Sequence, residues 1–184
     1  MKNLLTACLV FCCSVLLPAA ESKSPKFIKD FEESDRKARP PEGCIIFIGS
    51  SSFTIWKNLE KDMAPLPAFN RGFGGSQANQ AVLYADQLVI AYKPSRVVFY
   101  EGDNDIFTGK SPEAFLEECK KFTAKVHAAL PKTRIYFLSI KPSPSRAGKL
   151  ETYKQANALL RAYTATDPRL AYICLLYTSP SPRD

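Results

Sequence analysis

The chain has 184 residues, of which 46% are hydrophobic and 23% charged, and its formal net charge is +7. These values are ordinary for one globular domain with its own core, and they leave no room for a second domain of usual size. The basic residues are scattered, with no run longer than Lys120-Lys121 and no stripe interleaved with aromatic residues, so we expect no nucleic-acid partner.

The first twenty residues have the pattern of a secretory signal peptide. Lys2 precedes an apolar stretch over residues 4–17, and the small residues of Pro18-Ala19-Ala20 follow it. The apolar stretch is too short for a convincing membrane span. We therefore predict a signal peptide at 1–20, cleavage after Ala20 or Ser22, and a secreted or periplasmic mature protein with no membrane span. A lipoprotein anchor is the weaker alternative, because the cysteines of this segment lie inside the apolar stretch.

Beyond this segment, short apolar runs alternate with helical patterns. Strands are predicted at 44–49, 68–73, 96–100, 134–140 and 170–173, and helices at 25–38, 77–91, 111–130 and 147–165. Unbroken apolar runs are typical of strands buried on both faces. Strands that alternate with helices indicate a parallel sheet with right-handed crossovers. We predict an α/β fold, a three-layer α/β/α sandwich with a parallel, flavodoxin-like sheet over residues 23–173, in which the fifth strand is incomplete.

Three cysteines remain outside the predicted signal peptide: Cys44, Cys119 and Cys174. An odd and sparse set of this kind does not form a disulfide framework. Cys119 shares a helical face with Phe115 and Phe122, so we expect it to be buried as a small hydrophobic residue.

Small and polar residues follow each of the first three predicted strands. The strands run into Gly49-Ser50-Ser51-Ser52, into the segment 72–76 (Gly-Phe-Gly-Gly-Ser) and into the segment 101–105 (Glu-Gly-Asp-Asn-Asp). Each segment alone has an ordinary explanation as a helix cap, a turn or a loop closure. In an open parallel sheet, however, ligands bind at the carboxyl ends of the strands. The three segments together therefore predict a binding or catalytic site at that edge.

Other kinds of site fit the sequence poorly. Gly109-Lys110-Ser111 ends like a phosphate-binding loop, but the required earlier glycine is Asn104, and Gly72-x-Gly74 begins a dinucleotide fingerprint that fails at Gln77. The acidic residues of 101–105 could hold a hard cation, but no further cluster of ligands accompanies them. We predict neither a cofactor nor a metal.

The three segments resemble the first three blocks of the SGNH, or GDSL-type, hydrolases in order, spacing and position at strand ends. The matching residues are 47–51 (Phe-Ile-Gly-Ser-Ser), 70–75 (Asn-Arg-Gly-Phe-Gly-Gly) and 102–105 (Gly-Asp-Asn-Asp). The resemblance covers residues 44–173 and implies a carboxylic ester hydrolase. It assigns the nucleophile to Ser51 and the oxyanion donors to Gly75 and Asn104. The first block reads Gly-Ser-Ser instead of Gly-Asp-Ser, which leaves the nucleophile position filled.

The family's fourth block, Asp-x-x-His after the fifth strand, has no counterpart in the sequence. The single histidine, His127, lies in a predicted helix, where we expect a solvated side chain that cannot reach the carboxyl edge of the sheet. Residues 174–184 contain two prolines among serines and cannot continue a buried strand. We interpret them as a non-native tail, and we expect the natural chain to continue with the rest of the strand and the missing block, so that the printed chain is close to inactive.

Two functions remain open at this point. The first is an ester hydrolase that acts on a small-molecule, glycan or lipid ester. The second is a non-catalytic module that binds an acyl or glycan group at the Ser51 edge of the same fold. The sequence defines neither the substrate nor the oligomeric state.

Overall fold

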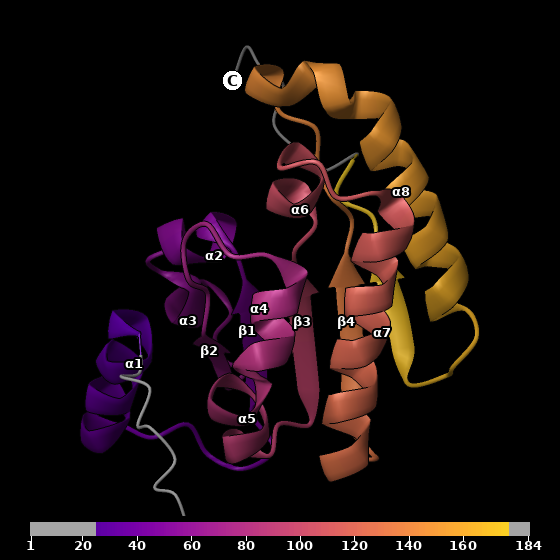
Figure 1. Ribbon diagram of the computed structural model, residues 1–184. Helices are drawn as coiled ribbons and strands as arrows, with labels where there is room; N and C mark the ends of the chain where they lie inside the picture. Colours follow the sequence, from indigo (N-terminus) through magenta and orange to yellow (C-terminus); the bar gives the residue numbers. More distant parts are fainter. Residues whose placement is uncertain (1–24, 177–184) are drawn as a thin grey trace, which may run out of the picture.

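A computed structural model describes residues 25–176 of the chain (Figure 1). The predicted signal peptide and most of the predicted tail lie outside these residues. The sheet has five strands: β1 (Ile45–Gly49), β2 (Ala68–Asn70), β3 (Arg96–Tyr100), β4 (Arg134–Leu138) and β5 (Leu170–Ile173). All neighbouring strands are parallel, and their order is β2-β1-β3-β4-β5. This is the predicted flavodoxin-like order.

Helices cover both faces of the sheet to unequal extents (Figure 1). They are α1 (Lys26–Lys37), α2 (Ser51–Ile55), α3 (Leu59–Asp62), α4 (Ala78–Leu83), α5 (Ala85–Leu88), α6 (Asp103–Phe107), α7 (Pro112–Ala129) and α8 (Leu150–Thr164), with the 3₁₀ segments η1 (Ile90–Tyr92) and η2 (Pro144–Lys149). In a right-handed crossover, the direction of the step along the sheet sets the face on which the helix lies. The step from β1 to β2 runs opposite to the later steps, so α2 and α3 pack on one face and α4, α5, α7 and α8 on the other. The α/β/α prediction is confirmed.

The larger core lies between the sheet and the four helices of the second face. At its centre the ring of Phe99 lies 4.7 Å from that of Phe122 and 5.1 Å from that of Phe137, measured between centroids. All three rings are fully buried, and burying one such side chain stabilises the fold by about 1.5–3 kcal/mol. Cys119 is buried in the same core, as predicted. The opposite face has a smaller cluster of Ile45, Phe47, Phe53, Leu59, Ala68 and Tyr100.

The helix predicted over residues 77–91 is broken into three parts. Ala81, Ala85 and Leu88 are buried at the predicted helical spacing, but the backbone leaves helical torsions at Val89, and Tyr84 ends α4. The break at Val89 buries that residue in the core and turns the chain towards η1. The prediction identified the buried face correctly and missed the breaks, because side-chain periodicity does not report backbone torsions.

The N-terminal helix α1 is firmly attached to the rest of the domain. Asp35 forms a largely buried ion pair with Arg71, which follows β2, and also accepts a hydrogen bond from the Tyr92 hydroxyl. In the first turn of α1, the Phe27 ring stacks on that of Phe73, with the centroids 4.4 Å apart. The helix predicted at 25–38 is confirmed, and these contacts fix it beside the second strand. None of the helices within residues 25–176 is long and apolar enough to cross a membrane.

Candidate active site

The three serines after β1 have different environments. Ser50 is the N-cap of α2 and is buried, with its N–H donating to the Tyr100 carbonyl at 3.2 Å. Ser52 is exposed and contacts the Tyr100 hydroxyl. Ser51, the first residue of α2, is exposed, and its side chain has no hydrogen-bond partner within residues 25–176. Of the three, Ser51 is therefore the hydroxyl that is both accessible and unengaged.

The second block is held against α2. The Asn70 side chain donates to the Phe53 carbonyl at 2.6 Å and accepts from the Gly72 N–H at 2.9 Å. A Cβ at Gly72 would lie 2.5 Å from the Phe53 Cβ, so only glycine permits this close approach. The loop then turns through Gly75, whose φ is +77°. Gly75 is exposed, and its N–H donates to no group described in the structure.

The third block meets the second through Asn104. The Asn104 side chain on α6 donates to the Ser76 carbonyl at 2.8 Å, which joins residues 28 positions apart. Ser76 directly follows Gly75 in the chain. The structure thus brings the loop containing Gly75 next to the Asn104 carboxamide at the carboxyl edge of the sheet, as the sequence predicts.

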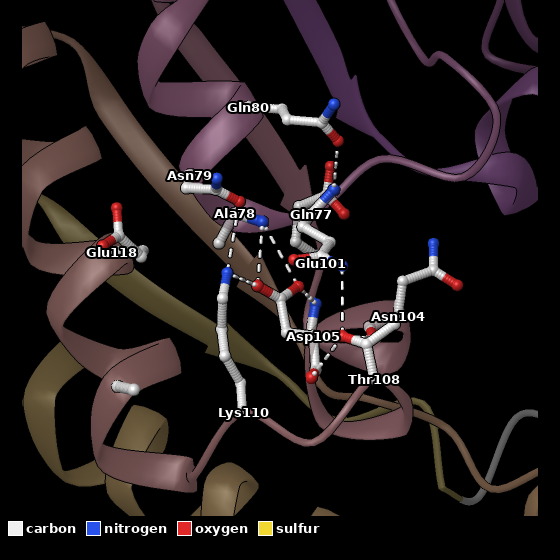
Figure 2. Close-up of polar contacts among 12 residues, drawn as sticks. Gln77, Ala78, Asn79, Gln80, Glu101, Asn104, Asp105, Thr108, Lys110 and Glu118 are labelled. Carbon is white, nitrogen blue, oxygen red and sulfur yellow. Dashed lines mark hydrogen bonds and ion pairs between the residues drawn. The ribbon is translucent and has the colours of Figure 1, made fainter.

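Asp105 fixes the relative position of the second and third blocks (Figure 2). Its fully buried carboxylate accepts from the Ala78 N–H at 3.2 Å, the Gly102 N–H at 3.1 Å and Lys110 Nζ at 2.7 Å. These donors belong to the start of α4, the loop before α6 and the segment after it. Asp105 is therefore engaged as a scaffold, and the residues described in the structure contain no cluster of three or more potential metal ligands.

A cleft of about 640 Å³ opens beside this edge. One wall is α1, with Phe27 and Phe31, and the other contains Thr54 and Trp56 at the end of α2. Gly75 is part of its lining. Trp56 is 37% exposed, and its indole N–H donates to Asp62 at 2.6 Å, so the ring is held in one orientation.

Residues 49–178 match the model of the GDSL-like lipase/acylhydrolase family. The chain belongs to this family. Its members are ester hydrolases, and the predicted family resemblance is confirmed. Comparison with curated protein sequences gives no match.

Solved structures of similar fold include several hydrolases at low sequence identity. A Streptococcus pneumonia protein provisionally described as a platelet activating factor is 17% identical, with a TM-score of 0.74 over 86% of this chain and 77% of that one. A provisionally assigned Bacteroides fragilis acylhydrolase is 18% identical, with a TM-score of 0.71 over 86% and 82%. A GDSL-like lipase of Bacteroides thetaiotaomicron is 18% identical, with a TM-score of 0.66 over 80% and 77%. These likenesses establish the GDSL-type fold.

The histidine of this GDSL-type domain lies away from the predicted site. Nε2 of His127, near the end of α7, is 3.0 Å from the carbonyl of Thr133, which precedes β4. The amino end of β4 and the carboxyl end of β1 are opposite edges of a parallel sheet. Our expectation of a solvated side chain was wrong, because His127 is half-buried and burial lowers its pKa. This position confirms the prediction that His127 cannot reach the carboxyl edge of the sheet, where Ser51 lies.

Sequence reasoning missed Arg146, which reaches the third block from η2. Its Nη2 donates to Asn104 Oδ1 at 3.1 Å, and its Nη1 lies 2.8 Å from a carboxylate oxygen of Asp103. The sequence placed Arg146 only in a Pro- and Ser-rich loop. One indication was present in the sequence. The loop that follows β4 lies at the carboxyl edge of the sheet and contains a single arginine.

Sequence reasoning also missed the burial of Glu101. This residue is 1% exposed, and one carboxylate oxygen accepts from the Ser76 hydroxyl at 2.6 Å. The other oxygen has no hydrogen-bond partner within the described residues. Burial raises the pKa of Glu101 well above its usual value, and the Ser76 hydrogen bond offsets only part of this effect.

We expect Glu101 to make the domain less stable as the pH rises. The unfolded chain releases the Glu101 proton near its ordinary pKa while the folded chain retains it, so the free energy of unfolding falls once the pH exceeds about 4.5. Glu101→Gln removes this titration. The difference in melting temperature, Glu101→Gln minus the parent chain, should therefore become more positive as the pH rises from 4 to 8, as measured by calorimetry. The exposed Glu113→Gln is the control, and an equal pH dependence in all three proteins would contradict the assignment.

Proposed function

We propose that the chain is a serine ester hydrolase with Ser51 as nucleophile and with the N–H groups of Ser51 and Gly75 and the Asn104 side-chain amide as oxyanion donors. The observation that carries this proposal is the meeting of three distant blocks at one edge. Both backbone N–H groups donate to no described group, and the Asn104 amide nitrogen uses one hydrogen for Ser76, which leaves the second available.

The proposed reaction is acyl transfer in two steps. Ser51 Oγ attacks the ester carbonyl carbon and gives its proton to a base, while an electron pair moves to the carbonyl oxygen. The three donors stabilise this oxyanion, each typically by about 3 kcal/mol. The intermediate then collapses, the ester C–O bond breaks, and the alcohol leaves with a proton. Water repeats the attack on the acyl-serine and releases the acid.

The cleft between α1 and Trp56 supports an extended substrate. It contains Gly75, so a carbonyl bound by the Gly75 N–H places one side of the ester towards the cleft. The residues that match the family model begin at Gly49, and α1 precedes them. The wall that α1 forms is therefore outside the segment that matches the family. Small-molecule, glycan and lipid esters all remain compatible with the cleft.

A non-catalytic binding module is the second candidate. The observation that favours it is the position of His127 at the opposite edge, which leaves Ser51 without an imidazole among residues 25–176. The two candidates differ in whether Ser51 forms a covalent acyl intermediate.

We expect a fluorophosphonate probe to label Ser51 in the chain that carries an Asp-x-x-His block after β5. The probe reports a nucleophilic serine beside an oxyanion hole. Peptide mapping by mass spectrometry identifies the labelled residue, and Ser51→Ala should abolish the label. Ser52→Ala is the matched control and should retain it. Labelling that survives Ser51→Ala would contradict the assignment, and a complete lack of labelling would favour the binding module.

A further inference from the structure

The loop after β4 places a guanidinium against the third block. Arg146 of η2 makes three contacts with α6: a hydrogen bond to Asn104 Oδ1 at 3.1 Å, an ion pair with Asp103 at 2.8 Å, and packing of its guanidinium carbon 4.3 Å from the Phe107 ring centroid. Its side chain is only 22% exposed. The side chain is therefore held in one place and is not a solvated surface charge.

Donor and acceptor chemistry then fixes the orientation of the Asn104 carboxamide. A guanidinium has donors only, so the oxygen end of the amide must face Arg146. The Ser76 carbonyl is an acceptor, so the nitrogen end must face Ser76, at 2.8 Å. These two partners require the same orientation. Rotating the amide by half a turn would break both hydrogen bonds and direct a carbonyl oxygen at the position where negative charge develops.

Arg146 also offsets the charge of the neighbouring carboxylate. Asp103 precedes Asn104, and a negative charge there would oppose an oxyanion at Asn104. The Asp103 carboxylate is held by Arg146 and by the Tyr153 hydroxyl, which donates to it at 2.8 Å. Burial and this hydrogen bond raise the pKa of Tyr153 to about 12, so the phenol remains a neutral donor at physiological pH.

We propose that Arg146 is a positioning residue, which fixes the Asn104 carboxamide as an oxyanion donor and neutralises Asp103 beside it. The proposal rests on the proposed function, because it assumes that Asn104 contacts the oxyanion. Arg146 itself acts through Asn104 and need not touch the substrate.

A double-mutant cycle on p-nitrophenyl acetate hydrolysis tests this role in the chain that carries an Asp-x-x-His block after β5, since the 184-residue chain is expected to have only a small residual rate. Arg146→Ala should lower kcat about 10- to 100-fold with little change in KM, because a charge-assisted hydrogen bond that orients a donor is lost. In the Asn104→Ala background the same change should have almost no effect on kcat, since no amide remains to be oriented. Arg146→Lys retains one donor and the charge, so it should recover part of the rate.

Two measurements separate this role from a structural one. The exposed Arg161→Ala is the matched control, and the melting temperature of each variant reports folding. In a ¹⁵N-labelled protein, Arg146→Ala should shift the Asn104 side-chain amide resonances, and Arg161→Ala should leave them in place. If Arg146→Ala lowers kcat as much in the Asn104→Ala background as in the parent chain, the proposal for Arg146 is overturned. The oxyanion role of Asn104 is not affected by that result. An unchanged kcat in Asn104→Ala would instead overturn the oxyanion role on which it rests.

Discussion

A chain in which the residues after Ile173 are replaced by a segment with an Asp-x-x-His block should hydrolyse p-nitrophenyl acetate on the order of 10⁴-fold faster than the 184-residue chain. The reason is that the 184-residue sequence contains one histidine, and this histidine lies away from Ser51. Ser51 is exposed at the carboxyl end of β1, whereas His127 contacts Thr133 before β4. Without an imidazole, the Ser51 hydroxyl keeps its proton near pH 7, and only the oxyanion donors remain to accelerate the reaction.

The experiment compares kcat for the two chains under the same conditions. His127→Gln in the 184-residue chain is the control, and its small residual rate should not change. Equal rates in the two chains would show that a base already lies within the printed sequence. A lower rate in His127→Gln would identify that base and would require a different site from the one proposed.

In the chain that carries an Asp-x-x-His block after β5, Asn104→Ala should lower kcat by about 100-fold or more while KM changes little, because the contact with the oxyanion forms mainly in the transition state. Asn58→Ala, at an exposed asparagine before α3, is the matched control. The melting temperature of Asn104→Ala must be measured as well, since the substitution also removes the hydrogen bonds to Ser76 and Arg146. An unchanged kcat would mean that Asn104 only closes the loop after β3.

The strands and the edge of the sheet that carries the proposed site were predictable from local patterns. Unbroken apolar runs gave five strands within a few residues of their observed bounds, and alternation with helices gave the parallel sheet. A parallel sheet directs every strand end that runs into glycine, serine or asparagine to the same edge. For this reason the three segments could be placed together from the sequence, and the family resemblance then assigned Ser51, Gly75 and Asn104 within them.

Contacts between distant segments were decided by the tertiary structure. Nothing in the sequence near Glu101 indicated that it would be buried with one oxygen unpaired, because burial depends on α4 and α7 packing over the third strand. Arg146 was indistinguishable from other loop arginines until η2 brought it 3.1 Å from Asn104. The sequence determines the order and chemistry of its blocks, since these depend on neighbouring residues. The partner of each buried or orienting side chain depends on the fold of the whole domain. That fold alone sets the distance between residues that are 25 positions apart, as Ser76 and Glu101 are, or 42 positions apart, as Asn104 and Arg146 are.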